Sequence, residues 1–343
     1  MIHPWLASQW ERLIGLRERL PHALLFSGPA GVGKRDLAEA LAGRLLCDAP
    51  DGVTGQACGR CEACALREAG NHPDLHVLEP VEDAGDSATK SAPRASGQIR
   101  IEQVRALQHA LSVTGHRSRH RVVVIEPAEA MNPFTANALL KILEEPPAGC
   151  VLILVSAAPQ RLLPTLRSRC QQWAFAPPDA QAVAAWHESH PAEAQAMLAV
   201  CGGAPLAAER LLARGLGPLL TRFVADISAV RRADALVLAG RWDAWLKSKE
   251  AGAAGLDIPL LVDWTQRWVS DLGQLALGGA PRYYPAAQPT LGQLARTANA
   301  VRVLNCYNEF IQIRRVAQHP LNVRLMLEDM LLRYTRALAE TGR

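Results

Sequence analysis

The sequence contains no long apolar run, no recognisable signal peptide and no internal repeat. Its longest apolar stretch, at about residues 150–158, is far shorter than the ~20 residues that a membrane-spanning helix needs. A charged segment followed by an apolar one, as in a secretory signal, is missing from the N-terminus. These absences argue against a membrane protein, a secreted protein and a repeat array. We therefore expect a cytoplasmic protein without a membrane partner.

A strong charge of either sign is also missing. The 37 Lys and Arg residues against 33 Asp and Glu residues leave a net charge of +4, which permits nucleic acid as a partner without requiring it. Residues 116–121, His-Arg-Ser-Arg-His-Arg, form the most basic turn. It could contact nucleic-acid phosphates, but a solvated loop is the favoured interpretation because most charge runs are simply exposed.

Disulfides are not expected in a cytoplasmic protein, so the eight cysteines should be thiols or metal ligands. Four of them lie within residues 47–64, as Cys47 followed by the C-x2-C-x2-C run of Cys58, Cys61 and Cys64. Four thiolates at this spacing suit a closed, structural Zn²⁺ site. Iron–sulfur clusters also use such runs but usually add a fourth cysteine and a proline just downstream, and neither is present. We predict structural zinc, with an iron–sulfur cluster or free thiols as alternatives.

Residues 28–35, Gly-Pro-Ala-Gly-Val-Gly-Lys-Arg, match the spacing of a phosphate-binding P-loop except at the last position. A predicted strand over 22–27 precedes the loop and a predicted helix over 34–46 follows it, which is the context that a P-loop requires. In such loops backbone N–H groups surround phosphates, the lysine neutralises their charge and a final hydroxyl binds Mg²⁺. The candidate nucleotide-binding residues are Gly28, Gly31, Gly33, Lys34 and Arg35, together with Glu126.

Two parts of the usual hydrolytic machinery are absent. Arg35 replaces the Mg²⁺-binding hydroxyl, and a guanidinium would repel a cation. A β-branched strand over 122–126 ends on Glu126, where a Walker B carboxylate is expected, but Pro127 follows and offers no side-chain base. Glu126 could bind Mg²⁺ in place of the usual aspartate. The sequence leaves binding of ATP or ADP open and argues against hydrolysis.

Strands alternate with helices over the first ~175 residues, which predicts an α/β domain with a parallel sheet covered on both faces. Pro177-Pro178 marks a boundary, and the remainder is predicted to be helical, with Trp264, Trp268 and Tyr334 in the helix-bundle core. Residues 82–97, rich in Gly, Ser, Ala and Asp, are predicted to be a mobile insertion. Further strands are predicted at 75–78, 150–155 and 172–175.

Arg169 lies in the segment Ser168-Arg169-Cys170, between the last two predicted strands. An arginine at the rim of a P-loop domain can be structural. It can also act as an arginine finger, which a subunit supplies in trans to stabilise charge in the transition state at its neighbour's ATP. Spacing alone does not decide between these roles.

Several stretches together resemble bacterial clamp-loader subunits of the AAA+ class. They are His-Ala-Leu-Leu-Phe at 22–26, the four-cysteine insertion, Asn-Ala-Leu-Leu-Lys at 137–141 leading to Glu-Glu-Pro-Pro at 144–147, Ser-Arg-Cys at 168–170 and Asn-Val-Arg-Leu-Met-Leu-Glu at 322–328. The resemblance implies an AAA+ nucleotide-binding-like domain over 1–175, a small helical lid over 176–215 and a helical collar over 216–343. In this family the collar holds five subunits in a ring.

Departures from the family pattern point to one type of subunit. The motor subunits, tau and gamma, carry a Thr after the P-loop lysine, Asp-Glu at Walker B and a lid arginine. This chain has Arg35, Glu126-Pro127 and, at 203–206, Gly-Ala-Pro-Leu. The delta subunit lacks the Ser-Arg-Cys segment, which is present here. A degraded ATP site beside a retained Ser-Arg-Cys resembles the delta-prime type.

The resemblance then implies a stator of the DNA polymerase III holoenzyme with no polymerase or ATPase activity of its own. Arg169, flanked by Ser168 and Cys170, would serve the ATP of an adjacent motor subunit. The implied partners are tau/gamma, delta, the sliding clamp and primer–template DNA, in a hetero-oligomeric ring.

Two other functions stay open. An active ATPase motor with an unusual P-loop would need substitutes for the hydroxyl, the catalytic carboxylate and the lid arginine. A zinc-dependent nucleic-acid-binding module is disfavoured, because the cysteine cluster lies inside an α/β domain and lacks a reading helix of the finger type.

Overall fold

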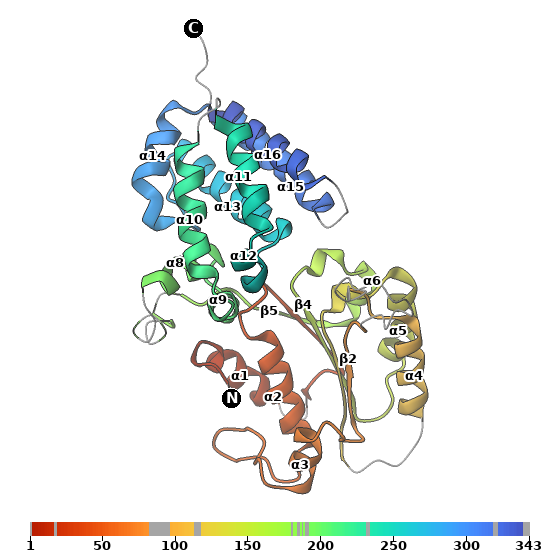
Figure 1. Ribbon diagram of the computed structural model, residues 1–343. Helices are drawn as coiled ribbons and strands as arrows, with labels where there is room; N and C mark the ends of the chain where they lie inside the picture. Colours follow the sequence, from red (N-terminus) through yellow and green to blue (C-terminus); the bar gives the residue numbers. More distant parts are fainter. Residues whose placement is uncertain are drawn as a thin grey trace. The chain divides into compact units, whose positions relative to one another are not determined.

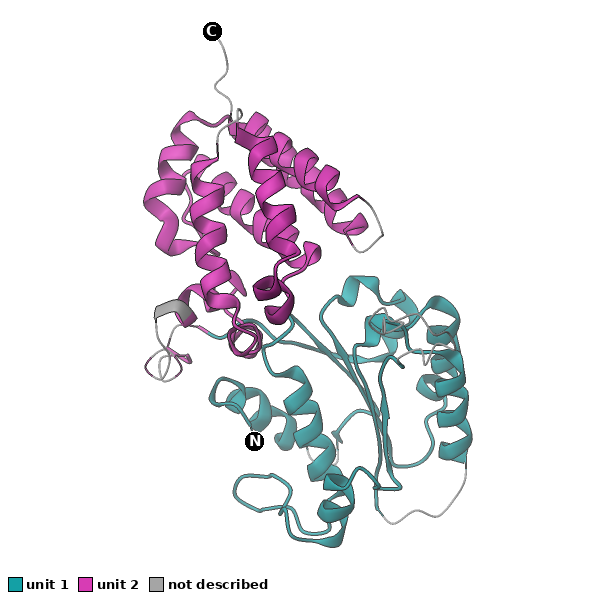
Figure 2. Cartoon of the chain, in the orientation of Figure 1, with its two compact units in different colours: residues 1–178 teal, residues 179–343 magenta. Residues whose placement is uncertain are grey.

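The computed structural model describes residues 2–16, 19–81, 97–112, 118–179, 181–183, 186, 188, 192–230, 234–317 and 322–338. The chain forms two compact units, residues 1–178 and 179–343 (Figure 2). The boundary follows Pro177-Pro178. The finer division of the second unit into a lid and a collar stays a prediction. Most of the predicted insertion at 82–97, and His116 and Arg117 of the basic turn, lie outside the described residues.

The first unit is built on a five-stranded sheet whose pairs are all parallel, in the order β2-β3-β4-β1-β5. The strands are β1 (Ala23–Ser27), β2 (Leu75–Leu78), β3 (Arg121–Ile125), β4 (Cys150–Ser156) and β5 (Gln171–Ala174). Every residue of β4 is buried, as expected for a central strand covered on both faces. The predicted parallel α/β sheet is confirmed, with β3 and β5 each one residue earlier than predicted.

Helices cover both faces of this sheet, with α1 and α2 on one side and α4 and α5 on the other (Figure 1). Leu139 and Ile142 of α5 pack in one core cluster with Leu152 of β4. Asn132 begins α5 by accepting a hydrogen bond from the Thr135 amide at 2.9 Å. The helices of this unit are η1 (Pro4–Leu6), α1 (Ala7–Gly15), α2 (Lys34–Leu46), α3 (Glu62–Glu68), α4 (Ile101–Ser112), η3 (Ala128–Ala130), α5 (Pro133–Glu144), η4 (Pro159–Arg161) and α6 (Pro164–Arg169).

The described residues of the second unit form helices joined by turns and loops, with no strand among them, as predicted. Its elements are α8 (Ala192–Val200), α9 (Pro205–Ala213), α10 (Leu216–Ala229), α11 (Ala235–Leu246), α12 (Lys249–Ala254), α13 (Ile258–Ala276), η6 (Pro285–Ala287), α14 (Gln288–Thr297), α15 (Ala300–Val316) and α16 (Val323–Leu338). None of the helices in the described part of the chain combines the length and apolarity needed to cross a membrane.

Large aromatic side chains fill the core of the second unit. Trp264, Trp268 and Tyr334 are fully buried, which confirms their predicted place in the core. The Trp268 indole N–H donates to the Tyr334 hydroxyl at 2.9 Å, and that hydroxyl donates to the Ile227 carbonyl at 3.4 Å. Burial raises the pKa of Tyr334, so the hydroxyl stays neutral. The pair joins α13 to α16 and satisfies two polar groups that have no access to water.

We predict that Tyr334→Phe lowers the free energy of unfolding by about 1–3 kcal/mol, because it leaves the buried Trp268 N–H without an acceptor. Urea unfolding of the parent and variant measures the difference. Tyr307→Phe on α15 is the control, since no hydrogen bond of that hydroxyl is present among the described residues. Equal effects of the two substitutions would contradict the prediction.

Candidate functional site

The glycine loop at 28–33 connects β1 to α2, so the strand–loop–helix context predicted for it is present. Gly28, Gly31 and Gly33 have φ angles of 151°, 82° and 94°, in the region that favours glycine. A Cβ atom added at Gly28 would lie 2.1 Å from the carbonyl oxygen of Phe175. Glycine is therefore required at Gly28 by the approach of another segment of backbone.

Lys34 is folded back onto the loop and is only 5% exposed. Its ammonium donates to the carbonyl of Gly28 at 2.8 Å and to that of Pro29 at 2.7 Å. The N-terminal segment covers the same loop, because the Trp5 indole N–H donates to the Val32 carbonyl at 3.1 Å. A phosphate bound here would have to compete with the loop's own carbonyls for this ammonium.

Arg35 is surrounded by three carboxylates. Its Nε lies 2.8 Å from Glu39 Oε1, its Nη2 lies 2.5 Å from Glu79 Oε1 and its Nη1 lies 3.4 Å from Glu126 Oε2. These partners, the hydrogen bond to Glu39 foremost, raise the pKa of the guanidinium. Burial raises the pKa of Glu126, and the charges of Arg35 and Lys34 oppose that rise. The four side chains form one charge network, called here the Arg35 network.

The residues at this end of the loop do not fit a magnesium ion. Mg²⁺ requires near-octahedral oxygen ligands at about 2.0–2.1 Å. Glu126, the candidate ligand from the sequence, faces the guanidinium of Arg35 instead, and no hydroxyl follows Lys34. A permanent cation thus stands where a P-loop protein would place its metal.

The sequence did not predict that Glu39 and Glu79 belong to the Arg35 network. Glu39 could have been found, because it is four residues after Arg35 on one helix face. Glu79 could be identified only once the strand pairing was known. Leu78 at the end of β2 pairs with Ile125 at the end of β3, and the parallel register sets the next residues, Glu79 and Glu126, side by side.

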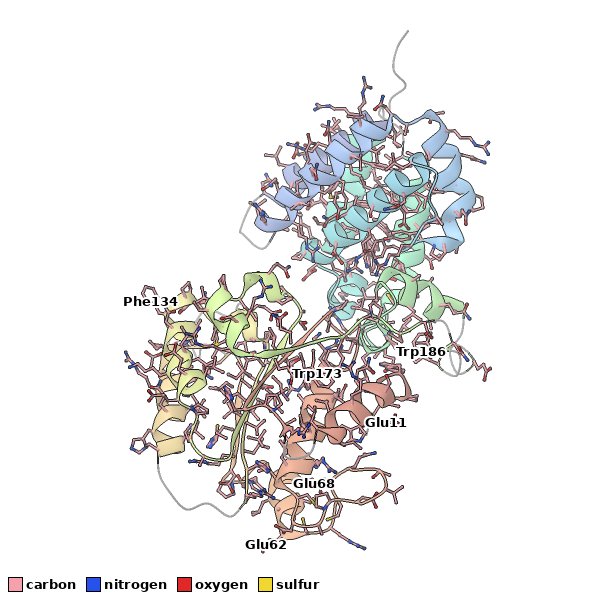
Figure 3. All side chains as sticks on the ribbon, turned by 180° about the vertical axis from the view of Figure 1, so that it is seen from behind. Glu11, Glu62, Glu68, Phe134, Trp173 and Trp186 are labelled. Carbon is pink, nitrogen blue, oxygen red and sulfur yellow. The ribbon has the colours of Figure 1, made fainter. Side chains whose placement is uncertain are left out.

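The four cysteines predicted to bind metal lie together, with their sulfur atoms all within 4.8 Å of one another. Cys47 ends α2, and the others surround the start of α3, whose ends are marked by Glu62 and Glu68 in Figure 3. The Cys47 sulfur lies 3.8 Å from that of Cys61 and 3.7 Å from that of Cys64. Ligand sulfurs about 2.3 Å from a tetrahedral ion would be about 3.8 Å apart. The cluster could therefore hold one metal ion.

Backbone amides support this arrangement of sulfur atoms. The Cys58 amide donates to the Cys47 sulfur at 3.3 Å, and the Cys64 amide donates to the Cys61 sulfur at 3.4 Å. Hydrogen bonds from the amides of Arg60 and Cys61 lower the pKa of Cys58 to about 6, whereas burial raises that of Cys64 to about 12. Amides directed at sulfur stabilise thiolates, the form that binds metal.

Arg169 is the last residue of α6 and is exposed at the surface. Its Nη2 lies 2.6 Å from Glu144 Oε1, and its Nη1 donates to the Thr165 carbonyl at 3.1 Å. The Ser168 hydroxyl donates to the same carbonyl at 3.1 Å. Cys170 is buried in the core, where desolvation raises the pKa of its thiol to about 11. Cys170 therefore anchors the segment in the core, while the charge of Arg169 is exposed at the surface.

The structure assigns Arg121, the last residue of the basic turn, a structural contact. Its guanidinium donates to the Leu111 carbonyl at 2.6 Å and to the Ala148 carbonyl at 3.2 Å, and so joins the end of α4 to the loop before β4. Among the described contacts, none joins Arg169 to the Arg35 network or to the cysteines. The candidate residues therefore form three separate clusters.

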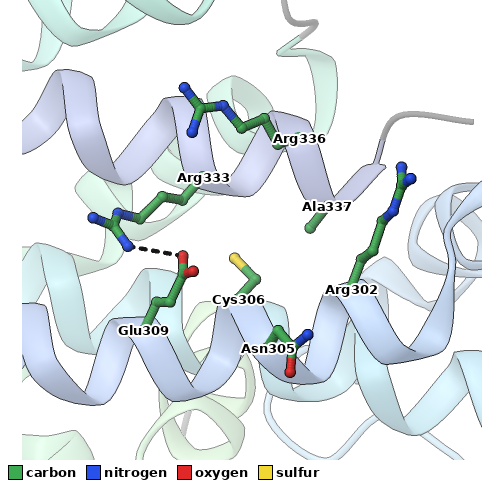
Figure 4. A pocket seen from close by; sticks show the side chains of 7 residues that line it. All are labelled: Arg302, Asn305, Cys306, Glu309, Arg333, Arg336 and Ala337. Atoms are coloured by element: carbon green, nitrogen blue, oxygen red, sulfur yellow. Dashed lines mark ion pairs between the residues drawn. The ribbon is translucent and has the colours of Figure 1, made fainter.

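A further polar cavity of about 390 Å³ lies between α15 and α16 in the second unit (Figure 4). Arg302, Arg333 and Arg336 line it, and Arg333 is paired with Glu309 at 3.0 Å. Burial raises the pKa of Cys306 in its wall to about 12, so this thiol is not a nucleophile. No sequence motif pointed to this cavity.

Comparison with known proteins finds relatives over most of the chain. The family model described as "DNA polymerase III, delta subunit" matches residues 5–179. DNA polymerase III subunit delta' of Pseudomonas aeruginosa is 41% identical over 274 residues, covering 78% of this chain and 76% of the relative. The Yersinia pestis subunit delta' is 31% identical over 363 residues, which cover 98% of this chain and 96% of the relative. DNA polymerase III subunit tau of Escherichia coli is 27% identical over 92% of this chain and 50% of its own length.

The Arg35 network leads to a pH-dependent prediction. Arg35→Met removes the cation that opposes the effect of burial on Glu126, so the already raised pKa of Glu126 rises further in the folded state. A carboxyl whose folded pKa is raised destabilises the fold when ionised, and this penalty disappears as the pH falls through the folded pKa. We expect a loss of about 1–2 kcal/mol near neutral pH that shrinks toward pH ~5.

Urea unfolding at the two pH values measures this loss. Arg105→Met, at an exposed position of α4, is the control and should show a small effect that is independent of pH. A loss at Arg35→Met that stays constant or grows toward acid pH would contradict the prediction.

Proposed function

This chain belongs to the DNA polymerase III delta-prime family of clamp-loader subunits, and we propose that it serves there as a stator that does not hydrolyse ATP. The observation that carries the proposal is the ion pair between Arg35 and Glu126. Hydrolysis by a P-loop protein needs Mg²⁺ held at this position and a group that orients the attacking water. Arg35 excludes the ion, and Pro127 supplies no such group.

The glycine loop and Lys34 are retained, which is compatible with bound ATP or ADP that stays intact. An active motor of the tau or gamma type is the alternative. It would need another metal-binding group beside a carboxylate that already has a cationic partner. The Arg35 network therefore favours the stator.

We further propose that Arg169 acts in trans on the ATP of an adjacent tau or gamma subunit. The support is its position at the exposed end of a short helix, with N–H donors left over after its described contacts. The same assembly would include delta, the sliding clamp and primer–template DNA in a hetero-oligomeric ring. The chain would thus contribute to clamp loading in the cytoplasm through one charged side chain rather than through its own ATP site.

We propose structural zinc for the cysteine cluster. Cys47, Cys58, Cys61 and Cys64 would fill all four coordination positions of a tetrahedral zinc ion, so no coordination position would remain open for a substrate. The ion would tie the end of α2 to the start of α3. Its role would be to order the insertion rather than to take part in catalysis.

Arg169→Ala tests the proposed function. A trans arginine contributes on the order of 10³–10⁵ to the rate at the ATP site that it serves, so DNA-dependent ATP hydrolysis at that site and clamp loading should both be lost. The assay uses the reconstituted clamp loader containing the parent chain or the variant. The isolated parent chain, with Mg²⁺ present, should show no turnover. Unchanged clamp loading by the variant, or turnover by the isolated chain, would overturn the proposal.

Metal removal tests the zinc assignment. We expect one zinc ion per chain by elemental analysis, and Cys61→Ser should lose it together with about 4 kcal/mol or more of the free energy of unfolding. Cys201→Ala, in the second unit, is the control and should keep the full zinc content. Iron in the purified protein, or a parent chain whose stability is unaffected by chelation, would contradict the assignment.

A further inference from the structure

The backbone on both sides of Arg169 is anchored in the core. Leu166, three residues earlier in α6, is 1% exposed, and Cys170, the next residue, is 7% exposed. Cys170 leads directly into β5, which pairs with β1 through Leu24 and Gln171. The Cα of Arg169 is therefore held by the sheet, and the freedom that remains lies in its long side chain.

Glu144 supplies the one described acidic contact of that side chain. The two terminal nitrogens of Arg169 are engaged on different partners, Nη2 with Glu144 and Nη1 with the Thr165 carbonyl. A guanidinium carries five N–H groups, and these contacts leave several without a partner among the described residues. The contacts thus fix the direction of the guanidinium while it keeps donors for a ligand.

The position of Glu144 is not explained by helix stability. It is the last residue of α5, where the helix dipole disfavours a negative charge. The pair with Arg169 is also a weak source of stability, since the two side chains are 49% and 37% exposed and solvent screens them. The described ion pair of this carboxylate is the one with Arg169.

We propose that Glu144 is the positioning residue of Arg169: it holds the guanidinium in the direction from which it reaches the neighbour's ATP. This inference rests on the proposed role of Arg169 in trans. Glu144 acts by restricting the side chain before the subunits meet, so that less conformational freedom is lost when the arginine engages phosphate. Its effect should be seen in kcat, because a finger acts on charge that develops in the transition state.

The test compares five reconstituted clamp loaders, containing the parent chain, Glu144→Gln, Glu145→Gln, Arg169→Ala or the double variant Glu144→Gln/Arg169→Ala. We expect Glu144→Gln to lower kcat of DNA-dependent ATP hydrolysis by about three- to tenfold, with KM for ATP unchanged. Glu145→Gln is the matched control, because it is the adjacent exposed carboxylate and has no described ion pair. The double variant should be no slower than Arg169→Ala alone.

The outcomes separate this inference from the proposed function. If Arg169→Ala is inactive and Glu144→Gln is fully active, the positioning role of Glu144 is overturned, but the proposed role of Arg169 in trans is not. Full activity in Arg169→Ala overturns both. If Glu144→Gln lowers kcat equally in the parent chain and in Arg169→Ala, Glu144 has a merely structural role. If Glu144→Gln raises kcat in the parent chain, Glu144 holds the arginine away from the ATP. Either result overturns the inference. Glu144→Asp, which keeps the charge, should recover part of the rate, and thermal unfolding of each variant confirms folding.

Discussion

The ion pair between Arg35 and Glu126 is the interaction on which the proposed lack of ATP hydrolysis depends. It forms where the glycine loop and the ends of β2 and β3 meet, so the parallel strand register brings Glu79 beside Glu126 and the first turn of α2 brings Arg35 to both. Three carboxylates this close would repel one another or recruit a dissociable metal ion. The single positive charge of the covalently attached guanidinium offsets part of their combined negative charge, so the three carboxylates can lie together at this end of the loop.

In the proposed stator, a domain that does not hydrolyse ATP would still provide a rigid frame for Arg169. β5 begins at Gln171, two residues after Arg169, and pairs with β1, which leads into the glycine loop. The position of Arg169 is consequently set by paired strands and buried anchors, not by the occupancy of a nucleotide site. This independence is what a fixed subunit requires if its neighbours change conformation as they bind and hydrolyse ATP. The direction of the guanidinium depends on two exposed contacts, with Glu144 and with the Thr165 carbonyl.

The features that the sequence predicted well are those that depend on patterns within short segments of the chain. Strand β2 follows from a short apolar run, helix α2 from its spacing of leucines, and the four cysteines from their intervals. Helices α3 and α6 were not predicted, because six or seven residues are too few to show a helical period. The contacts of Glu79 and Glu144 join segments far apart in the chain and depend on strand register and helix packing, which no local pattern encodes.

The glycine loop itself is weaker evidence for nucleotide than its sequence suggests. Gly28 is required by the carbonyl of Phe175, and Gly33 is favoured by its φ of 94°, so the backbone accounts for both glycines whether or not phosphate binds. Lys34 likewise satisfies two carbonyls of its own loop. A P-loop motif can therefore persist because the fold needs it. The proposed lack of hydrolysis rests instead on Arg35, where the sequence departs from the motif and the structure supplies acidic partners.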